Sequence, residues 1–261
     1  MRASYASRAA LVALYLASHA IVAQGEGADA PTVTPYRPTV SNPADLPVPG
    51  WFEFETGGLH VHGADGMRTD TLPWLLKYAF NADSGLLLGG NAYDRLSATD
   101  GSHASGFGDT LLEWKQRFAL REGVAFGIEA GVDMPTAARK LGVGKPAWLI
   151  NGIFSTDLGA SHLDLNLGGT RYTLKQPRAS LWQGAWAAAL SHPLGETFGV
   201  AIELSGTAQR GAGATHQVLG AINYNLSRRV VFDFGAARNL DRAAHDRSLF
   251  AGGTFLLGKF P

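Results

Sequence analysis

The amino-acid sequence predicts an all-β fold, a transmembrane antiparallel up-and-down β-barrel of about twelve strands with short periplasmic turns and longer extracellular loops. Three observations predict it. Apolar residues recur at every second position from Trp51 onward. Bulky apolar residues occupy one face of these segments and small or polar residues the other, as in a wall between lipid and a polar interior. The connections between segments alternate in length.

The composition of the 261 residues agrees with this fold class. Lys and Arg total 22 and Asp and Glu total 22, so the basic surface that a nucleic-acid partner requires is not expected. The chain has no Cys, which excludes a disulfide scaffold, a thiol nucleophile and a Cys-based zinc site. Glycine is abundant, at 33 residues, and only 17% of the residues are charged, which suits a surface that faces lipid.

Residues 1–23 have the layout of a cleaved signal peptide. Arg2 and Arg8 are basic, the run from Ala9 to Ala17 is apolar, and small residues at cleavage-site spacing precede Gln24. The apolar run is shorter than the ~20 residues of a membrane-spanning helix, and no later segment reaches that length. The protein is therefore expected to be exported and to insert into the bacterial outer membrane as a barrel.

Residues 24–50 are expected to form a proline-rich segment ahead of the barrel. Half of the chain's 12 prolines lie between Pro31 and Pro49, which excludes a helix or an inner strand. An extended chain of this kind fits either a periplasmic linker or a partial plug that threads into the lumen. The sequence does not separate the two.

The barrel is expected to occupy residues 51–261, because period-two segments follow one another through this range. Each predicted strand has a pair of apolar residues two positions apart or a similar apolar face: 51–62 (Phe52, Phe54), 71–80 (Leu72, Trp74), 85–94 (Leu86, Leu88), 107–118 (Leu112, Trp114), 123–133 (Phe126, Ile128), 147–156 (Trp148, Ile150), 161–170 (Leu163, Leu165), 181–190 (Trp182, Trp186), 197–206 (Val200, Ile202), 216–225 (Val218, Ile222), 230–237 (Phe232, Phe234) and 248–260 (Phe250, Leu256, Phe260). In the last strand Leu249, Phe255 and Leu257 blur the two faces, so its in/out register stays open.

The predicted connections set the orientation of the barrel. The longer ones are 63–70, 95–106, 134–146, 171–180, 207–215 and 238–247, and the shorter ones are 81–84, 119–122, 157–160, 191–196 and 226–229. Short turns face the periplasm in outer-membrane barrels. Five aromatic residues near strand ends are candidates for the girdles at the membrane interfaces: Trp51, Phe80, Phe118, Trp148 and Tyr224.

The polar face supplies the candidate functional residues. The predicted lumen-lining side chains are Glu53, Glu55, Lys77, Asn91, Asp109, Glu113, Lys115, Arg117, Glu129, Asp133, Asn151, Asp164, Asn166, Glu203, Asn223 and Asp233. Carboxylates outnumber basic residues in this set, which fits a cation-leaning pore with charged rings. The same set fits acid–base pairs that satisfy one another within the lumen.

The sequence predicts neither a metal site nor a cofactor, and the protein is not expected to be an enzyme. His60 and His62 lie two apart on one strand face, but a metal site needs three or four ligands and no third is evident. His162 stands near Asp164, yet no serine lies in a G-x-S-x-G nucleophile elbow.

Several passages carry a family resemblance. They are Tyr36-Arg37-Pro38-Thr39-Val40-Ser41-Asn42-Pro43, Gly106-Phe107-Gly108-Asp109-Thr110, Asp133-Met134-Pro135-Thr136, Asn151-Gly152, Leu163-Asp164-Leu165-Asn166-Leu167-Gly168 and Leu190-Ser191-His192-Pro193-Leu194-Gly195. In this order, over about residues 36–260, the chain resembles outer-membrane β-barrel transporters of the MetA-pathway phenol-degradation family. The resemblance implies an outer-membrane barrel with a transport role, but it assigns no substrate.

The expected function is passive passage of small solutes, including hydrophobic or aromatic ones, across the outer membrane. A closed structural or surface-binding barrel is the alternative, and a membrane-embedded hydrolase is the third reading. The expected partners are outer-membrane lipid, a small-molecule solute and the barrel-assembly machinery, with no nucleic acid and a monomeric state.

Overall fold

A computed structural model describes residues 31–138, 141–142, 144–173, 180–211, 213–241 and 246–259. The predicted signal peptide lies outside the described residues. Residues 32–261 form one compact unit, to which everything below refers. The described part of the chain contains no helix with the length and hydropathy needed to cross a bilayer.

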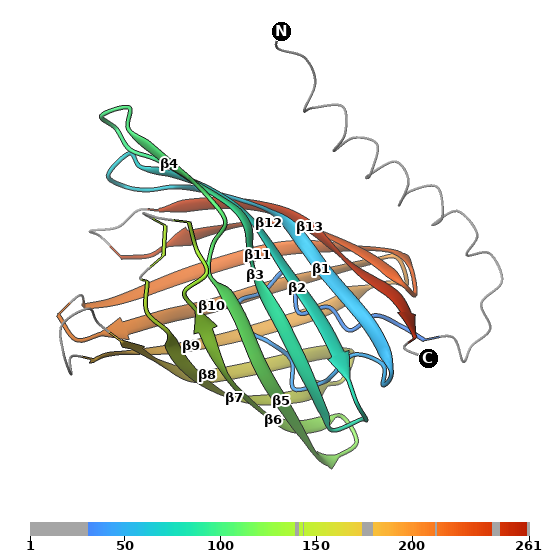
Figure 1. Ribbon diagram of the computed structural model, residues 1–261. Helices are drawn as coiled ribbons and strands as arrows, with labels where there is room; N and C mark the ends of the chain where they lie inside the picture. The colour runs from blue at the N-terminus through green and yellow to red at the C-terminus, as the bar shows by residue number, and fades with distance from the viewer. Residues whose placement is uncertain are drawn as a thin grey trace, which may run out of the picture. The chain divides into compact units, whose positions relative to one another are not determined.

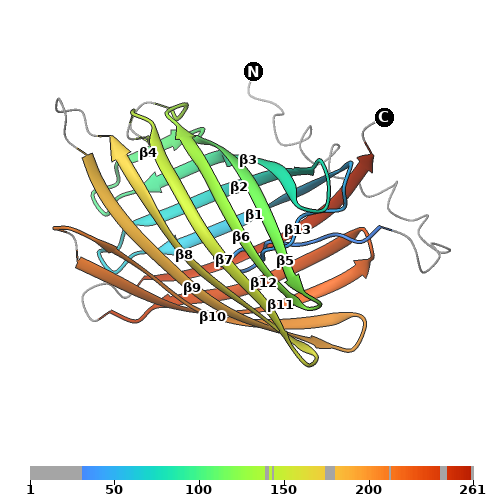
Figure 2. The same cartoon turned by 90° about the horizontal axis from the view of Figure 1, so that it is seen from below.

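The strands form one sheet that closes on itself (Figures 1 and 2). Their bounds are β1 (Trp51–His62), β2 (Arg68–Ala79), β3 (Ser84–Ser97), β4 (His103–Gly106), β5 (Thr110–Arg121), β6 (Val124–Met134), β7 (Ala147–Leu158), β8 (Ser161–Thr173), β9 (Ser180–Leu194), β10 (Phe198–Gln209), β11 (Gly213–Ser227), β12 (Val230–Asn239) and β13 (Arg247–Lys259). Neighbours in sequence pair antiparallel, β3 pairs with β5, and the ring closes where β1 pairs with β13. The predicted twelve-stranded barrel is confirmed, with β4 as an additional short strand.

Two features of the connections differ from the prediction. Several strands run further than expected, so the connections at 63–67 and 210–212 are shorter than predicted. The connection between β3 and β5 contains β4, which pairs with the end of β3 in a hairpin that projects from the barrel (Figure 1). The turns at the opposite end, 122–123, 159–160, 195–197 and 228–229, are all short, and this end is the periplasmic one.

The barrel wall is apolar on its outside, as predicted. Trp148, Trp182, Ile202 and Phe234 are each more than half exposed, although all four are large hydrophobic residues. Exposed large apolar side chains repeated around a closed ring of strands form the band that meets the hydrocarbon of the bilayer.

We expect Ile202→Arg to destabilise the membrane-inserted barrel by about 2–4 kcal/mol, because Ile202 lies near mid-depth on the lipid face of β10. Leu240→Arg is the matched control, since Leu240 is equally exposed but lies in the connection after β12. Urea titration of unfolding from phospholipid vesicles measures both changes. Equal effects at the two positions would contradict the assignment of Ile202 to the lipid face.

Aromatic side chains gather at the periplasmic end of the wall. Phe80 stacks on Trp114 with 5.6 Å between ring centroids, and Phe198 lies 5.3 Å from Tyr224. Phe118 pairs with Phe126 in the same zone, at the turn between β5 and β6. Aromatic rings at this depth sit at the headgroup level of a bilayer. Of the residues predicted for the girdle at this end, Phe80, Phe118 and Tyr224 therefore lie in an aromatic belt, whereas Trp51 packs against the inner cluster of Val33, Val231 and Leu256.

The structure resolves the in/out register of the last strand, which the sequence leaves open, and it turns Phe250 and Leu256 away from the outer face. Both side chains point inward and are buried, whereas Leu249 and Leu257 on the other face are more than half exposed. The physical reason is that apolar clusters lie inside the barrel: Phe250 packs with Leu219, Ala237 and Leu59, and Leu256 packs with Val33, Val231 and Trp51. Phe260, the third apolar residue predicted for this strand, lies outside the described residues.

Candidate functional site: the barrel lumen

Residues 32–50 run through the inside of the barrel (Figure 1, dark blue). Their hydrogen bonds and ion pairs reach inward side chains on strands all around the ring: Glu53 and Glu55 (β1), Lys77 (β2), Lys115 and Arg117 (β5), Glu129 (β6), Ser155 (β7), Asn166 (β8), Glu203 (β10) and Asp233 (β12). A segment that contacts opposite walls at once lies in the lumen. Most of these partners lie in the periplasmic half of their strands.

The first anchor of this segment is formed by β1 and β2. The Lys77 ammonium lies 2.6 Å from Glu53 Oε1 and 2.5 Å from Glu55 Oε1, and all three side chains are buried. The backbone N–H of Thr34 donates to Glu53 Oε2 at 2.8 Å, and that of Tyr36 donates to Glu55 Oε1 at 2.7 Å. The wall carboxylates thus bind the backbone of the segment and the lysine beside them.

Tyr36 occupies the centre of the buried charges. The ammonium groups of Lys77 and Lys115 lie 3.8 Å and 4.0 Å from the centroid of its ring. Its hydroxyl donates to the carbonyl of Asp45 at 2.8 Å, and the residue is almost fully buried. Cation–π contacts strengthen when they are desolvated, so this ring stabilises two lysines that point into the lumen.

A second anchor lies across the lumen, at β5 to β8. Lys115 pairs with Glu129 at 3.0 Å and donates to the carbonyl of Pro43. The Asn42 amide donates to both oxygens of Glu129, and its backbone N–H donates to Asn166 at 3.0 Å. The Asn42 amide, the Asn42 backbone N–H and the Pro43 carbonyl thereby each have a partner on the wall.

A third anchor uses glycines of the inner wall as a cradle. The Arg37 guanidinium forms two hydrogen bonds of 2.9 Å with Asp233. A Cβ placed on Gly57 would lie 2.8 Å from Arg37 Nη2, and one on Gly252 would lie 2.7 Å from Arg37 Nε. Only a wall position without a side chain leaves this space. Part of the unusual glycine content therefore serves to seat residues 32–50.

We expect Gly252→Val to destabilise the protein by about 1–3 kcal/mol, because the new side chain would overpack against Arg37 and the Thr56 carbonyl. Gly220→Val is the control, since a Cβ at Gly220 meets nothing within 4 Å. Both changes add the same side chain to a strand glycine. Thermal unfolding in detergent compares them, and equal shifts would show that the cradle is not occupied.

The donors on residues 32–50 explain how an acidic lumen is stabilised. A buried carboxylate is costly unless cations or hydrogen-bond donors satisfy it. In addition to the carboxylates already described, Glu203 accepts from the Ser41 N–H at 2.7 Å, and Arg117 pairs with Asp45 of the segment at 2.7 Å. These contacts favour the pairing hypothesis for the inward charges over a ring that selects ions.

Three predicted lumen residues, Asn91, Asp109 and Asp133, lie apart from these anchors. Asn91 donates to Asp94, and Asp109 accepts from the Ala137 N–H, both toward the extracellular end. Asp133 is the next-to-last residue of β6, lies at the same end of the barrel and is half-buried. The remaining residues predicted for this face, Glu113, Asn151 and Asn223, are inward and at least partly buried.

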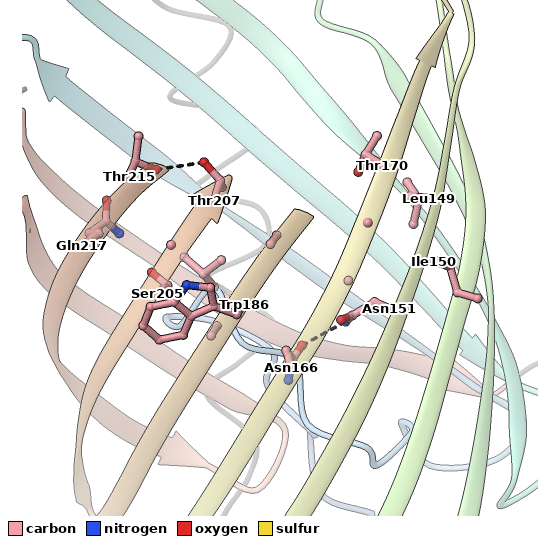
Figure 3. A pocket seen from close by; sticks show the side chains of 16 residues that line it. Leu149, Ile150, Asn151, Asn166, Thr170, Trp186, Ser205, Thr207, Thr215 and Gln217 are labelled. Atoms are coloured by element: carbon pink, nitrogen blue, oxygen red, sulfur yellow. Dashed lines mark hydrogen bonds between the residues drawn. The ribbon is translucent and has the colours of Figure 1, made fainter. Parts of the chain in front are cut away.

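The extracellular half of the lumen contains two cavities. One cavity of about 380 Å³ is bounded by β7 to β11 (Figure 3), where its lining includes Leu149, Thr170, Ala185, Thr207 and Gln217. None of the described residues that line it is ionisable. A second cavity of about 340 Å³ has the apolar residues Leu59, Val61, Leu219 and Phe250 in its lining, and it also borders the charged residues Arg37, Asp246 and Arg247. Val40 of the inner segment borders both, so we call the two cavities together the vestibule.

Ser155, Asp164 and His162 lie together near the periplasmic end, but they are not arranged for nucleophilic catalysis. Ser155 donates to Asp164, and His162 contacts Asp164 at 3.2 Å and Asp157 at 2.6 Å. A serine nucleophile needs its hydroxyl on the histidine, and here the carboxylate stands between them. Ser155 is also buried and accepts from the Ala44 N–H, so it serves as an anchor.

Sequence reasoning missed the residues of the inner segment as site residues. Tyr36, Arg37, Ser41 and Asn42 carry the contacts, but a chain without periodicity gives no sign of which side chains face a partner. The family-like lead at 36–43 was the available signal. His60, considered as a metal ligand, instead pairs with Asp70 at 2.6 Å on the outer face of the wall.

Comparison with solved structures finds a similar barrel fold in outer-membrane porins. The NanC porin matches with a TM-score of 0.60 at 9% identity, over 78% of this chain and 100% of that one. The KdgM porin, solved with disordered oligogalacturonate, matches with a TM-score of 0.52 at 9% identity, over 78% and 99%. The CymD monoaromatic hydrocarbon channel gives 0.47 at 9% identity, over 80% and 89%. At these identities the likeness concerns the fold.

The closed barrel and its apolar outer band show a protein of the bacterial outer membrane. No curated protein sequence matches the chain. The model of one protein family, described as "Putative MetA-pathway of phenol degradation", matches residues 40–257. This match covers the barrel and much of the inner segment, and the chain belongs to that family.

Proposed function

We propose that the protein gives small, uncharged solutes, including apolar and aromatic ones, a passive route into the outer membrane barrel and across the membrane. The observation that carries the proposal is the vestibule, two cavities of several hundred Å³ at the extracellular side, the first of which has no ionisable residue in its described lining. Solute-binding pockets have this size and mixed lining. The porin names of two structural relatives support the same class of function.

The proposed role of residues 32–50 is that of a plug. Their contacts fill the periplasmic half of the lumen and engage most of the inward charges there, so a hydrated ion finds neither an open path nor a free charged ring in this half. A small neutral solute carries no hydration shell that must be replaced by charged groups. The plug therefore favours uncharged solutes over ions.

Permeation assays test this proposal with two probes. Vesicle swelling measures entry of the neutral sugar arabinose, and intact cells report entry of the uncharged aromatic dye N-phenyl-1-naphthylamine by its fluorescence in lipid. Faster entry of either probe than in samples without the protein supports the proposal. Failure of both probes would contradict it.

The filled periplasmic half also favours a second candidate, a closed structural barrel without transport. It shares every contact described above and differs in one expected result. A closed barrel passes neither probe in its native form, and the same assays therefore separate the two functions.

A further inference from the structure

The wall between β1 and β2 contains a break in its hydrogen-bonded ladder. The strands pair at Thr56 with Trp74 and again at Leu59 with Thr71, but residues 57–58 and 72–73 between them have no pairing across the two strands. β1 is held on its other edge, where residues 57 and 58 pair with β13. The break is therefore local to one seam of the barrel.

The sequence accounts for this break. Pro73 has no backbone N–H to donate to the ladder. The facing residues are Gly57 and Gly58, which give strand pairing no side-chain support. The register between β2 and β3 also shifts at Leu72 and Pro73, so β2 is bulged on its other side. The Thr56 hydroxyl donates to the Pro73 carbonyl at 3.0 Å and replaces part of the lost pairing.

Hollows lie on both sides of the same seam. Inside, the vestibule cavity that borders Pro73 also includes Leu59 and Phe250. Outside, a hollow of about 440 Å³ extends over the lipid face and is lined by Gly58, Leu72, Tyr93, Phe234, Leu249 and others. Leu59 and Phe250 border both hollows. The two hollows therefore approach each other at Leu59 and Phe250.

We propose that this seam is a lateral exit, through which small apolar solutes pass from the vestibule into the bilayer. The inference rests on the proposed channel function and adds the direction and the solute class. The straight path to the periplasm leads through a buried network of charges, whereas the path through the seam is lined by Leu59, Phe250, Leu72 and Phe234. An apolar solute loses no hydrogen bonds on this second path, but a sugar or an ion would.

A polar residue pair lies at the extracellular rim of the proposed exit. His60 and Asp70 form a 2.6 Å pair there, and both belong to the lining of the outer hollow. The rest of that lining is mostly apolar, with Leu72, Tyr93, Phe234 and Leu249 each at least 39% exposed. A solute leaving here would enter hydrocarbon below the headgroups.

A glycine pair provides a matched test. Gly58 at the seam and Gly220 on β11 are both exposed, and a Cβ at either meets nothing within 4 Å. Gly58→Leu places a side chain in the mouth of the exit, whereas Gly220→Leu adds the same bulk to an intact part of the wall. We expect the first variant to reduce dye entry into cells to the level of cells without the protein and the second to leave it unchanged.

A reversible closure gives a second readout. Residues 58 and 72 face each other in the register on either side of the break, and the chain has no native Cys. Oxidised Gly58→Cys/Leu72→Cys should block entry of N-phenyl-1-naphthylamine, and reductant should restore it in the same cells. The control disulfide, Leu165→Cys/Ala188→Cys, joins a paired position of β8 and β9 and should have no effect.

The outcomes separate this inference from the function on which it rests. Dye entry that persists in both closed variants would overturn the lateral exit while leaving the channel in place. Arabinose entry without dye entry in the native protein would also overturn it. Entry of neither probe would overturn the proposed function itself, and the exit with it.

Discussion

Removing residues 32–48 is expected to raise the single-channel conductance of the barrel by at least about tenfold, since a twelve-stranded lumen without its filling is wide enough to hold water. These residues now occupy the periplasmic half of the lumen through anchors at Tyr36, Arg37 and Asn42. Water would then solvate the exposed carboxylates and lysines. Recording in planar bilayers measures the change.

A control deletion of residues 24–30 leaves every described contact in place and should not alter conductance. A milder variant, Tyr36→Ala with Arg37→Ala, keeps the segment but removes two anchors, and should give intermittent openings. If the long deletion conducted no better than the native protein, the plug role of the segment would be wrong. The milder variant covers the case in which the deletion does not assemble.

Lys115→Met is expected to destabilise the protein by about 3–5 kcal/mol, because it leaves buried carboxylates without their cation. Lys115 is fully buried, pairs with Glu129 at 3.0 Å and also contacts the Pro43 carbonyl and the Tyr36 ring. Arg121→Met on the same strand is the control, since Arg121 is exposed at the end of β5. Denaturant titration in vesicles compares the free energies of unfolding.

The double variant Lys115→Met/Glu129→Gln removes both members of the pair and should recover part of the lost stability. A measurement of ion selectivity can contradict the assignment of Lys115 to structural pairing. If Lys115→Met moved the reversal potential of the conducting deletion variant strongly while stability stayed unchanged, the inward charges would set selectivity. Pairing predicts the reverse, a large loss of stability with a small change in selectivity.

The barrel could be predicted from sequence because each strand is subject to opposite demands on its two faces. Lipid requires Ile202 or Phe234 outside, and the small inner wall requires Gly57 or Ala187 inside, which produces the period of two. The last strand is an exception, because the large apolar residues Phe250 and Leu256 lie on its inner face. Those side chains pack into apolar clusters within the lumen, and such clusters depend on partners from other strands and from Val33.

The anchors of the inner segment could not be predicted in the same way. Residues 32–50 have no periodicity, and their conformation is determined by the wall around them through contacts such as Arg37 with Asp233, 196 positions apart in the sequence. The inward charges were identifiable from strand alternation, but their partners were not. The sequence therefore indicated the chemistry of the lumen, and tertiary structure was needed to show what satisfies it.

The position of residues 32–50 inside the lumen is the central claim, and one engineered disulfide tests it most directly. A Cβ on Gly127 would lie 3.4 Å from the Ala44 Cβ, close to the separation in a disulfide. With no native Cys, Ala44→Cys/Gly127→Cys should be joined nearly completely in protein taken from outer membranes. Two free thiols that both react with a maleimide in that protein would show that the segment lies elsewhere.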